Sequence, residues 1–260
     1  MVIAVYVDDA IICANNFETL IVEKECISRK FEMDDRGELD YILGMTVKRD
    51  RKNRILTIDQ NLYLKDILKR FGMEDCKPVG TPVEPGKKFI KLADQKEVFD
   101  DIQLYQAAIG SLNYAAIATR PDLSVAVGML SKFMSNPSKD HWCGIKRVMR
   151  YIRGTLDLGL KFSYSDDFRL WGFSDADWAG CLDTRKSTSG HVFRLGNATI
   201  GWRSKKQSVV ALSSTESEYV ALCAAAQETV WLRNLLKGVG LERKNATVIY
   251  EDNQARVLWR

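Results

Sequence analysis

The chain lacks any pair of closely spaced cysteines, because its six cysteines are scattered without a CxxC motif. That distribution argues against a zinc site and against a disulfide scaffold, and it is typical of free thiols in a reducing compartment. Its two histidines, His141 and His191, stand alone, and no Ser-His-Asp triad can be assembled around either of them.

Long apolar runs are absent as well, since no stretch approaches the ~20 residues that a membrane span needs. The apolar start meets Asp8 and Asp9 almost at once and has no basic leader, so it does not resemble a secretion signal. We therefore expect an intracellular protein that does not enter a membrane. The net charge of +4 permits nucleic-acid binding without requiring it.

What is present is an ordinary globular composition, 46% hydrophobic and 28% charged, which is too apolar for disorder. With 260 residues, the chain can hold one large domain or two modest ones. The best internal boundary is residues 76–91, which contain three of the five prolines and predict an extended linker.

Acidic residues follow predicted strands near the C-terminal end. A short strand at residues 169–173 runs into Asp175 and Asp177, and a strand at 247–250 runs into Asp252. A rigid strand end is a common place for a catalytic acid, although a polar turn closing a hairpin also explains such residues. Between them lie a hairpin around a Gly-Asn loop and a further predicted strand at residues 209–212.

The clearest helix of the chain begins with a capping box at Ser213 and Glu216 and continues to residue 236. Glu218 lies on its predicted sheet-facing side. A backbone hydrogen bond or a metal ion would explain an acid in that position. Asp175, Glu218 and Asp252 thus come from three elements, and acids gathered in this way repel one another unless cations lie between them. Mg²⁺ suits such oxygen sites, with Mn²⁺ as the alternative ion.

These residues belong to motifs that resemble the ribonuclease H domain of copia-type LTR retrotransposon Pol polyproteins. The matching stretches are residues 174–180 (SDADWAG), 185–190 (RKSTSG), 213–219 (SSTESEY) and 252–254 (DNQ). The resemblance implies that Asp175, Glu218 and Asp252 are metal-binding catalytic acids and that Asp177 is a neighbour. Glu251 departs from the cysteine usual in the family, and the chain ends before the fourth acid of the family.

Two predicted strands at residues 2–7 and 10–14 enclose Asp8 and Asp9, which a simple hairpin turn would also tolerate. Ahead of a ribonuclease H domain, the sequence YVDD resembles the catalytic hairpin of a reverse transcriptase palm. The resemblance implies that Asp8 and Asp9 hold the Mg²⁺ ions of nucleotide addition. Because the upstream palm and fingers of the family are missing here, we do not expect this chain to polymerise DNA by itself.

Residues 105–155 are predicted to be helical, and their third helix, starting near Ser138, carries a basic face. The basic residues of this face are Lys146, Arg147, Arg150 and Arg153. Such a face suits a nucleic-acid backbone, and a solvated helix surface is the alternative. Motifs here also resemble the copia-type connection, with Gln106 departing from a usual basic residue, so the resemblance covers nearly the whole chain.

Together these features predict an α/β plus helical fragment. It contains a partial polymerase palm and thumb (residues 1–75), a linker (76–104), a helical connection (105–165) and a truncated ribonuclease H-like mixed-sheet domain (166–260).

The expected partners are an RNA:DNA hybrid or template-primer and the missing Pol regions. The expected activity in the full protein is RNA-directed DNA synthesis with Mg²⁺-dependent cleavage of hybrid RNA. The alternative is an inactive or domesticated remnant that at most binds nucleic acid. A ribonuclease H-like nuclease of another family would leave YVDD unexplained.

Overall fold

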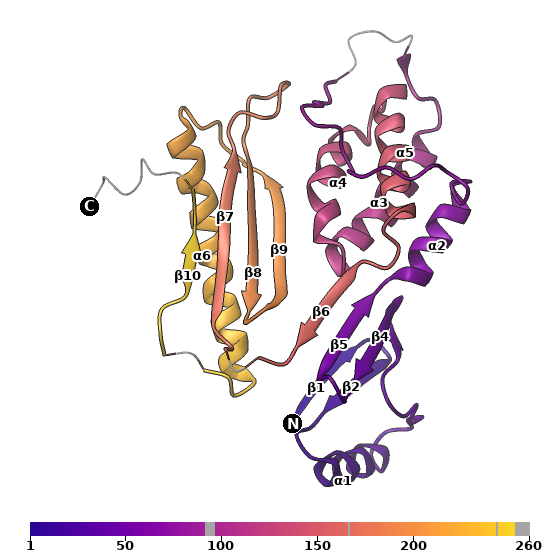
Figure 1. Cartoon of the computed structure of the whole chain (residues 1–260), viewed down its shortest axis with the longest axis vertical. Helices are drawn as coiled ribbons and strands as arrows, with labels where there is room; N and C mark the ends of the chain where they lie inside the picture. Colours follow the sequence, from indigo (N-terminus) through magenta and orange to yellow (C-terminus); the bar gives the residue numbers. More distant parts are fainter. Residues whose placement is uncertain (92–96, 166, 243, 253–260) are drawn as a thin grey trace.

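The computed structural model describes residues 1–91, 97–165, 167–242 and 244–252, which form a mixed α/β architecture with three separate β-sheets. Figure 1 shows a hairpin and a small sheet near the N-terminus, a group of helices above them, and a second four-stranded sheet with one long helix beside it. In this part of the chain, no helix combines the length and apolar character that crossing a membrane requires. The helix predicted from Asn253 lies outside the described residues.

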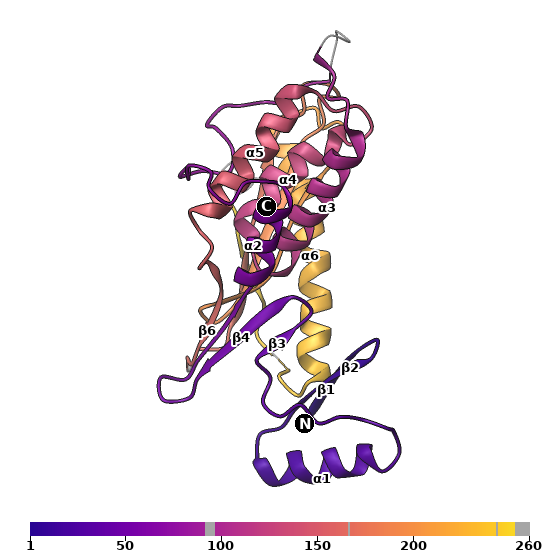
Figure 2. The same cartoon turned by 90° about the vertical axis from the view of Figure 1, so that its right-hand side faces the viewer.

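The N-terminal hairpin consists of β1 (Val2–Tyr6) paired antiparallel with β2 (Asp9–Cys13). Helix α1 (Phe17–Ser28) follows and is capped by the side chain of Asn16. No residue of α1 is buried, and the apolar side chains of β1 are exposed. Figures 1 and 2 both place α1 at the end of the molecule away from the helical group. Packing within the chain therefore stabilises this region little.

The second sheet is antiparallel throughout and has the strand order β3-β4-β5-β6. Its strands are β3 (Tyr41–Ile42), β4 (Met45–Asp50), β5 (Ile55–Asp59) and β6 (Gly159–Ser163). Because β6 follows the helices in sequence, this sheet joins segments that the sequence-based division assigned to the palm and to the connection.

The helical group contains the largest core of the molecule, in which Leu112, Leu130 and Ile145 are fully buried. Its elements are α2 (Asn61–Arg70), α3 (Ile102–Ala118), η2 (Pro121–Leu123), α4 (Ser124–Leu130), η3 (Ser131–Phe133) and α5 (Lys139–Arg153). Ser138 caps α5, which agrees with the helix start predicted near this residue.

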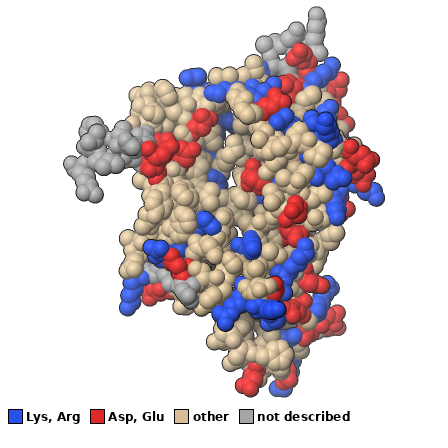
Figure 3. Space-filling view, in the orientation of Figure 1, with Lys and Arg blue, Asp and Glu red and all other residues tan. Residues whose placement is uncertain are grey.

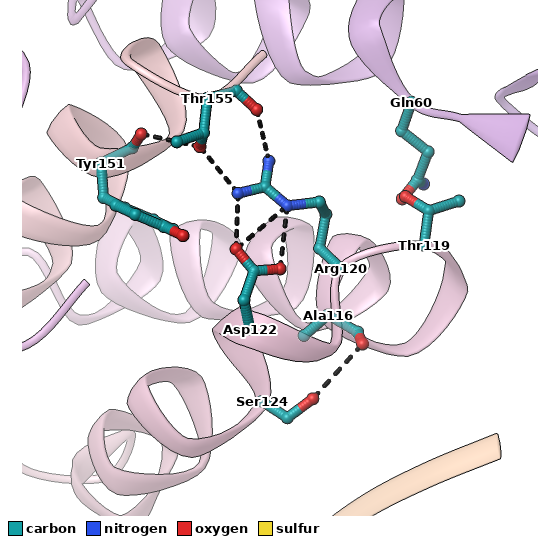
Figure 4. Close-up of polar contacts among 8 residues, drawn as sticks. All are labelled: Gln60, Ala116, Thr119, Arg120, Asp122, Ser124, Tyr151 and Thr155. Atoms are coloured by element: carbon teal, nitrogen blue, oxygen red, sulfur yellow. Dashed lines mark hydrogen bonds and ion pairs between the residues drawn. The ribbon is translucent and has the colours of Figure 1, made fainter. Parts of the chain in front are cut away.

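Arg120 holds the break between α3 and α4 against the end of α5 (Figure 4). Its side chain is 1% exposed and pairs with Asp122 at 2.7 Å. It also donates to the Thr155 carbonyl at 3.0 Å and to the Thr155 hydroxyl at 2.7 Å. Asp122 therefore binds this arginine at the break between the two helices.

The third sheet has the order β10-β7-β8-β9, with β10 parallel to β7 and the other pairs antiparallel. Its strands are β7 (Leu170–Asp177), β8 (Thr188–Leu195), β9 (Ala198–Lys206) and β10 (Val248–Tyr250). Helix α6 (Ser214–Gly238) packs on one face, where Leu232 and Leu236 meet Leu170 and Phe193.

The strand predicted at residues 209–212 is not formed. Instead β9 continues through residues 203–206, because the β8–β9 hairpin extends its pairing as far as Thr188 with Lys206. Val209 and Val210 are 48% and 47% exposed in the connection to α6. The basic residues 203–206 are thus part of the sheet.

Candidate metal centre and basic helix

Asp175 lies near the C-terminal end of β7, an internal strand of the third sheet. Side chains alternate along a strand, so Leu170 and Ser174 are buried on the α6 side while Phe173 and Asp175 are exposed. Asp175 therefore reaches solvent from an element whose other face is fixed in a core.

Strand β10 brings Asp252 to the same end of the sheet. It runs parallel to β7 with Tyr250 opposite Phe173, so a continuation by two residues lays Asp252 beside Asp175. Figure 3 shows acidic side chains gathered on this face where β10 ends.

Helix α6 supplies the third acid from its first turns. The Ser213 hydroxyl accepts from the Glu216 amide at 3.1 Å, and the Glu216 carboxylate accepts from the Leu212 amide at 2.6 Å. These contacts confirm the predicted capping residues and start the helix at a defined point. Glu218 then faces inward and is 5% exposed, whereas Asp175 and Asp252 are exposed.

The three predicted acids meet. One carboxylate oxygen from each of Asp175, Glu218 and Asp252 lies within 4.8 Å of the other two. Within the described ranges this is the only such group of three or more His, Cys, Asp or Glu side chains. Three carboxylates at this spacing repel one another, and their all-oxygen donor set fits a hard divalent cation.

Contacts between neighbouring elements support this arrangement. The Trp178 indole N–H donates to the Ala211 carbonyl at 3.2 Å, which ties the end of β7 to the segment before α6. The Ala179 amide donates to the Ser187 hydroxyl at 3.0 Å. Sequence reasoning missed Ser187 and Gln207, because the sequence does not show which groups a polar residue in a connecting segment will contact.

Asp177 lies outside the acid cluster, as expected for a neighbour. Its carboxylate packs against Gly180, where a Cβ atom would come within 1.6 Å of Asp177 Oδ2. A side chain at position 180 would therefore displace the Asp177 carboxylate.

Comparison with known proteins identifies the family. Over 261 residues, 99% of this chain, the sequence is 39% identical to the retrovirus-related Pol polyprotein from transposon TNT 1-94 of Nicotiana tabacum. It is 36% identical over 231 residues to the uncharacterized mitochondrial protein AtMg00810 of Arabidopsis thaliana, covering 94% of that protein. It is also 31% identical over 229 residues to a putative transposon Ty5-1 protein of Saccharomyces cerevisiae, covering 72% of it. The chain belongs to the copia-type retrotransposon Pol polyproteins.

The chain corresponds to only part of a full Pol polyprotein, since it spans 20% of the length of the tobacco polyprotein. Residues 1–85 match the family described as reverse transcriptase (RNA-dependent DNA polymerase). Asp8 and Asp9 fall in this matched part, at the turn of the β1–β2 hairpin, and both are exposed. They are not members of the acid cluster in the described residues.

The basic helix of this Pol segment is α5, and its arginines hold a segment of the chain itself. We call residues 74–91 the strap. Arg147 donates to the Thr81 hydroxyl and to the Glu84 carboxylate, both at 3.0 Å. Arg150 and Arg153 each donate to a strap carbonyl at 2.7 Å.

Further contacts continue along the strap toward the start of α5. His141 Nε2 contacts the Ile90 carbonyl at 3.0 Å, and burial lowers the pKa of this histidine. The Phe89 ring lies where a Cβ on Gly144 would be only 2.7 Å away. The predicted linker is thus bound along α5, and contact of Lys146, Arg147, Arg150 and Arg153 with nucleic acid stays a prediction.

Proposed function

We propose that this chain contributes ribonuclease H activity, cutting RNA in an RNA:DNA hybrid, when it is part of a copia-type Pol polyprotein. In this proposal residues 166–260 form the ribonuclease H-like domain and residues 105–165 the connection. Residues 1–75 form the end of the polymerase palm and the start of the thumb, and residues 76–104 form the linker.

The observation that supports the proposal is the convergence of Asp175, Glu218 and Asp252 within 4.8 Å. Two neighbouring strand ends and one helix have to be placed together to produce it, so a chance grouping of surface acids is a poor explanation. Two of the acids are exposed and open to a large substrate, while the third backs them from inside the fold.

Asp175, Glu218 and Asp252 would hold Mg²⁺, or Mn²⁺ in its place. Divalent ions bound there supply charge neutralisation and activation of water for phosphodiester hydrolysis. The protein's own contribution is to keep three carboxylates together on rigid elements, with Asp175 and Asp252 directed at the substrate.

Asp8 and Asp9 would serve RNA-directed DNA synthesis in the same polyprotein. Their support is the reverse transcriptase family match over residues 1–85. In this proposal the hairpin works with Pol regions outside this chain, and the nucleic-acid partner is a template-primer or hybrid.

Cleavage of an RNA:DNA hybrid tests the first proposal. A hybrid with end-labelled RNA is incubated with the chain and Mg²⁺ or Mn²⁺, beside single-stranded RNA as a substrate control. We expect hybrid cleavage that Glu218→Gln abolishes and that the matched variant Asp177→Asn retains, because Asp177 lies outside the cluster.

The remnant hypothesis predicts a different result. No cleavage in either metal by the folded wild-type chain would reject ribonuclease activity for this chain. Equal cleavage by the wild type and Glu218→Gln would trace the activity to another site or to a contaminant.

A further inference from the structure

The position of Glu218 depends on how α6 is fixed to the third sheet. Asp175 and Asp252 are aligned by direct pairing of β7 with β10. Glu218 comes from a separate helix, and strand pairing places no limit on how far the first turn of that helix lies from the two aspartates. Some contact has to set this distance if the three carboxylates are to share an ion.

Gln207 makes that contact. It directly follows β9 and is 6% exposed. Its backbone amide donates to the Ser187 carbonyl at 2.9 Å, which fixes the residue beside the start of β8. Its side-chain Nε2 donates to the Ser189 hydroxyl at 2.9 Å and to the Ser217 carbonyl at 2.8 Å.

The Ser217 carbonyl belongs to the peptide that leads directly into Glu218. A side-chain amide suits this place, because its nitrogen offers two N–H donors without adding a charge beside the acids. The carbonyl can only accept, which fixes which end of the amide faces the helix. One buried group therefore joins β8 on one side to the residue before Glu218 on the other.

We infer that Gln207 is a positioning residue that sets the first turn of α6, and with it Glu218, at the distance from Asp175 that metal binding needs. The expected effect on metal binding rests on the proposed function. The expected effect on the structure of α6 rests on the hydrogen bonds alone. Gln207 itself does not reach the substrate in this scheme.

The test compares Gln207→Leu with Ser189→Ala in the full chain. Gln207→Leu removes both donated hydrogen bonds at similar volume, whereas Ser189→Ala removes the β8 contact and leaves the bond to α6. Hydrogen exchange of peptides covering residues 213–222 reports the first turns of α6, and residues 225–236 report the rest of the helix. Mn²⁺ titration followed by electron paramagnetic resonance reports the cluster without any need for activity.

We expect Gln207→Leu to lose protection in residues 213–222 while residues 225–236 stay protected. We also expect its Mn²⁺ dissociation constant to rise about tenfold, the low end of what groups that orient metal ligands contribute. Hybrid cleavage should then fall in kcat and be partly restored by raised Mn²⁺, with KM for the hybrid unchanged. Ser189→Ala should stay close to the wild type in each measurement.

Unchanged protection in residues 213–222 of Gln207→Leu would overturn the inference, as would a wild-type Mn²⁺ affinity in that variant. Loss of protection over the whole of α6 would also overturn it, because the residue would then be a general packing group. A wild-type chain that neither binds Mn²⁺ nor cleaves would reject the proposed function, and the exchange comparison would still decide the role of Gln207.

Discussion

Two regions of the molecule present acids at strand ends, and they differ in how those acids are held. Asp8 and Asp9 lie at the turn of a two-stranded hairpin whose residues are largely exposed. Asp175 and Asp252 lie near the C-terminal ends of two neighbouring strands in a four-stranded sheet. Helix α6 covers one face of this sheet and adds Glu218.

The difference teaches that a strand end alone does not make a metal site. An isolated two-stranded hairpin is marginally stable in water. Among the described residues, Asp8 and Asp9 also form no cluster with a third acid from another element. The C-terminal cluster draws on two strands and a helix, and side chains such as Trp178 connect those elements. Within this chain, we therefore expect divalent ions to bind at the second region and not at the first.

The largest expected effect comes from replacing one aspartate in each region by asparagine and comparing the two variants. Asp175→Asn should weaken Mn²⁺ binding by more than the about 10–100-fold that changes around metal ligands cause, because it removes a ligand itself. The matched variant Asp8→Asn should leave Mn²⁺ affinity unchanged. Isothermal titration of the two variants checks this. Equal losses from both would mean that the hairpin also holds ions, and the contrast between the regions would break down.

A second effect concerns the helical group, which contacts the third sheet at β9. Arg120→Met should lower the free energy of unfolding by about 3 kcal/mol, near the lower limit for breaking a buried ion pair. The pair is open on one side, since the Asp122 side chain is 31% exposed while that of Arg120 is 1% exposed.

Urea denaturation followed by Trp fluorescence measures this change. Exchange of the hairpin amides in β1 and β2 should be equally fast in Arg120→Met and in the wild type, because the hairpin does not depend on that core. Slower or faster exchange of the hairpin amides in the variant would show that the two regions unfold together.

Much of the C-terminal region could be predicted from sequence because its signals are local. The capping residues Ser213 and Glu216 start α6 where expected, and the inward face of Glu218 follows from helical periodicity. The motif resemblance grouped Asp175, Glu218 and Asp252, and the parallel pairing of β10 with β7 supplies the physical reason.

The parts that sequence could not supply depend on contacts between distant segments. Val209 and Val210 match a strand by composition, yet the sheet instead continues through Lys206. Strand β6 pairs with β5 across the whole helical group. Likewise, nothing in the proline-rich segment 76–91 indicates that α5 will bind it. Its contacts with α5 combine the Lys77 carbonyl, a group that any sequence possesses, with the single side chains of Thr81 and Glu84.

The basic helix offers a smaller and more discriminating test. Arg150 donates to the strap carbonyl of Lys77, whereas Lys146 has no hydrogen bond to the strap among the contacts of the described residues. Arg150→Ala should therefore lower stability by about 1 kcal/mol. Lys146→Ala should preserve stability and, if α5 meets a phosphate backbone, reduce the salt dependence of hybrid binding by about one unit of slope.

Thermal unfolding and binding titrations at several salt concentrations separate these roles. Like the acid cluster, the strap relies on contacts between elements distant in sequence. If Arg150→Ala leaves stability unchanged but flattens the salt dependence, the arginine serves nucleic acid and the strap contact is incidental. If neither variant changes the slope, α5 is not part of the nucleic-acid interface.

The smallest expected effect is a pH dependence from His141 on the strap side of the molecule, whereas the N-terminal hairpin contains no histidine. Burial lowers the pKa of His141, and its Nδ1 accepts from the Ser138 amide at 2.9 Å while the ring also contacts Ile90. A proton on Nδ1 would face that amide donor, so the folded state binds the proton less readily than the unfolded state does. Stability should therefore be complete above the ordinary histidine pKa of about 6.5 and should decline as pH falls below it toward the lowered value.

Urea unfolding at pH 7.5 and pH 5.5 measures this decline, and the pH sensitivity of His141→Asn should be smaller than that of the wild type. His191, whose pKa burial also lowers, serves as the matched comparison through His191→Asn. Protease cleavage within the strap should increase at pH 5.5 in the wild type if His141 holds Ile90 in place. An acid sensitivity that disappears only in His191→Asn would assign the effect to the third sheet, because that histidine lies on β8.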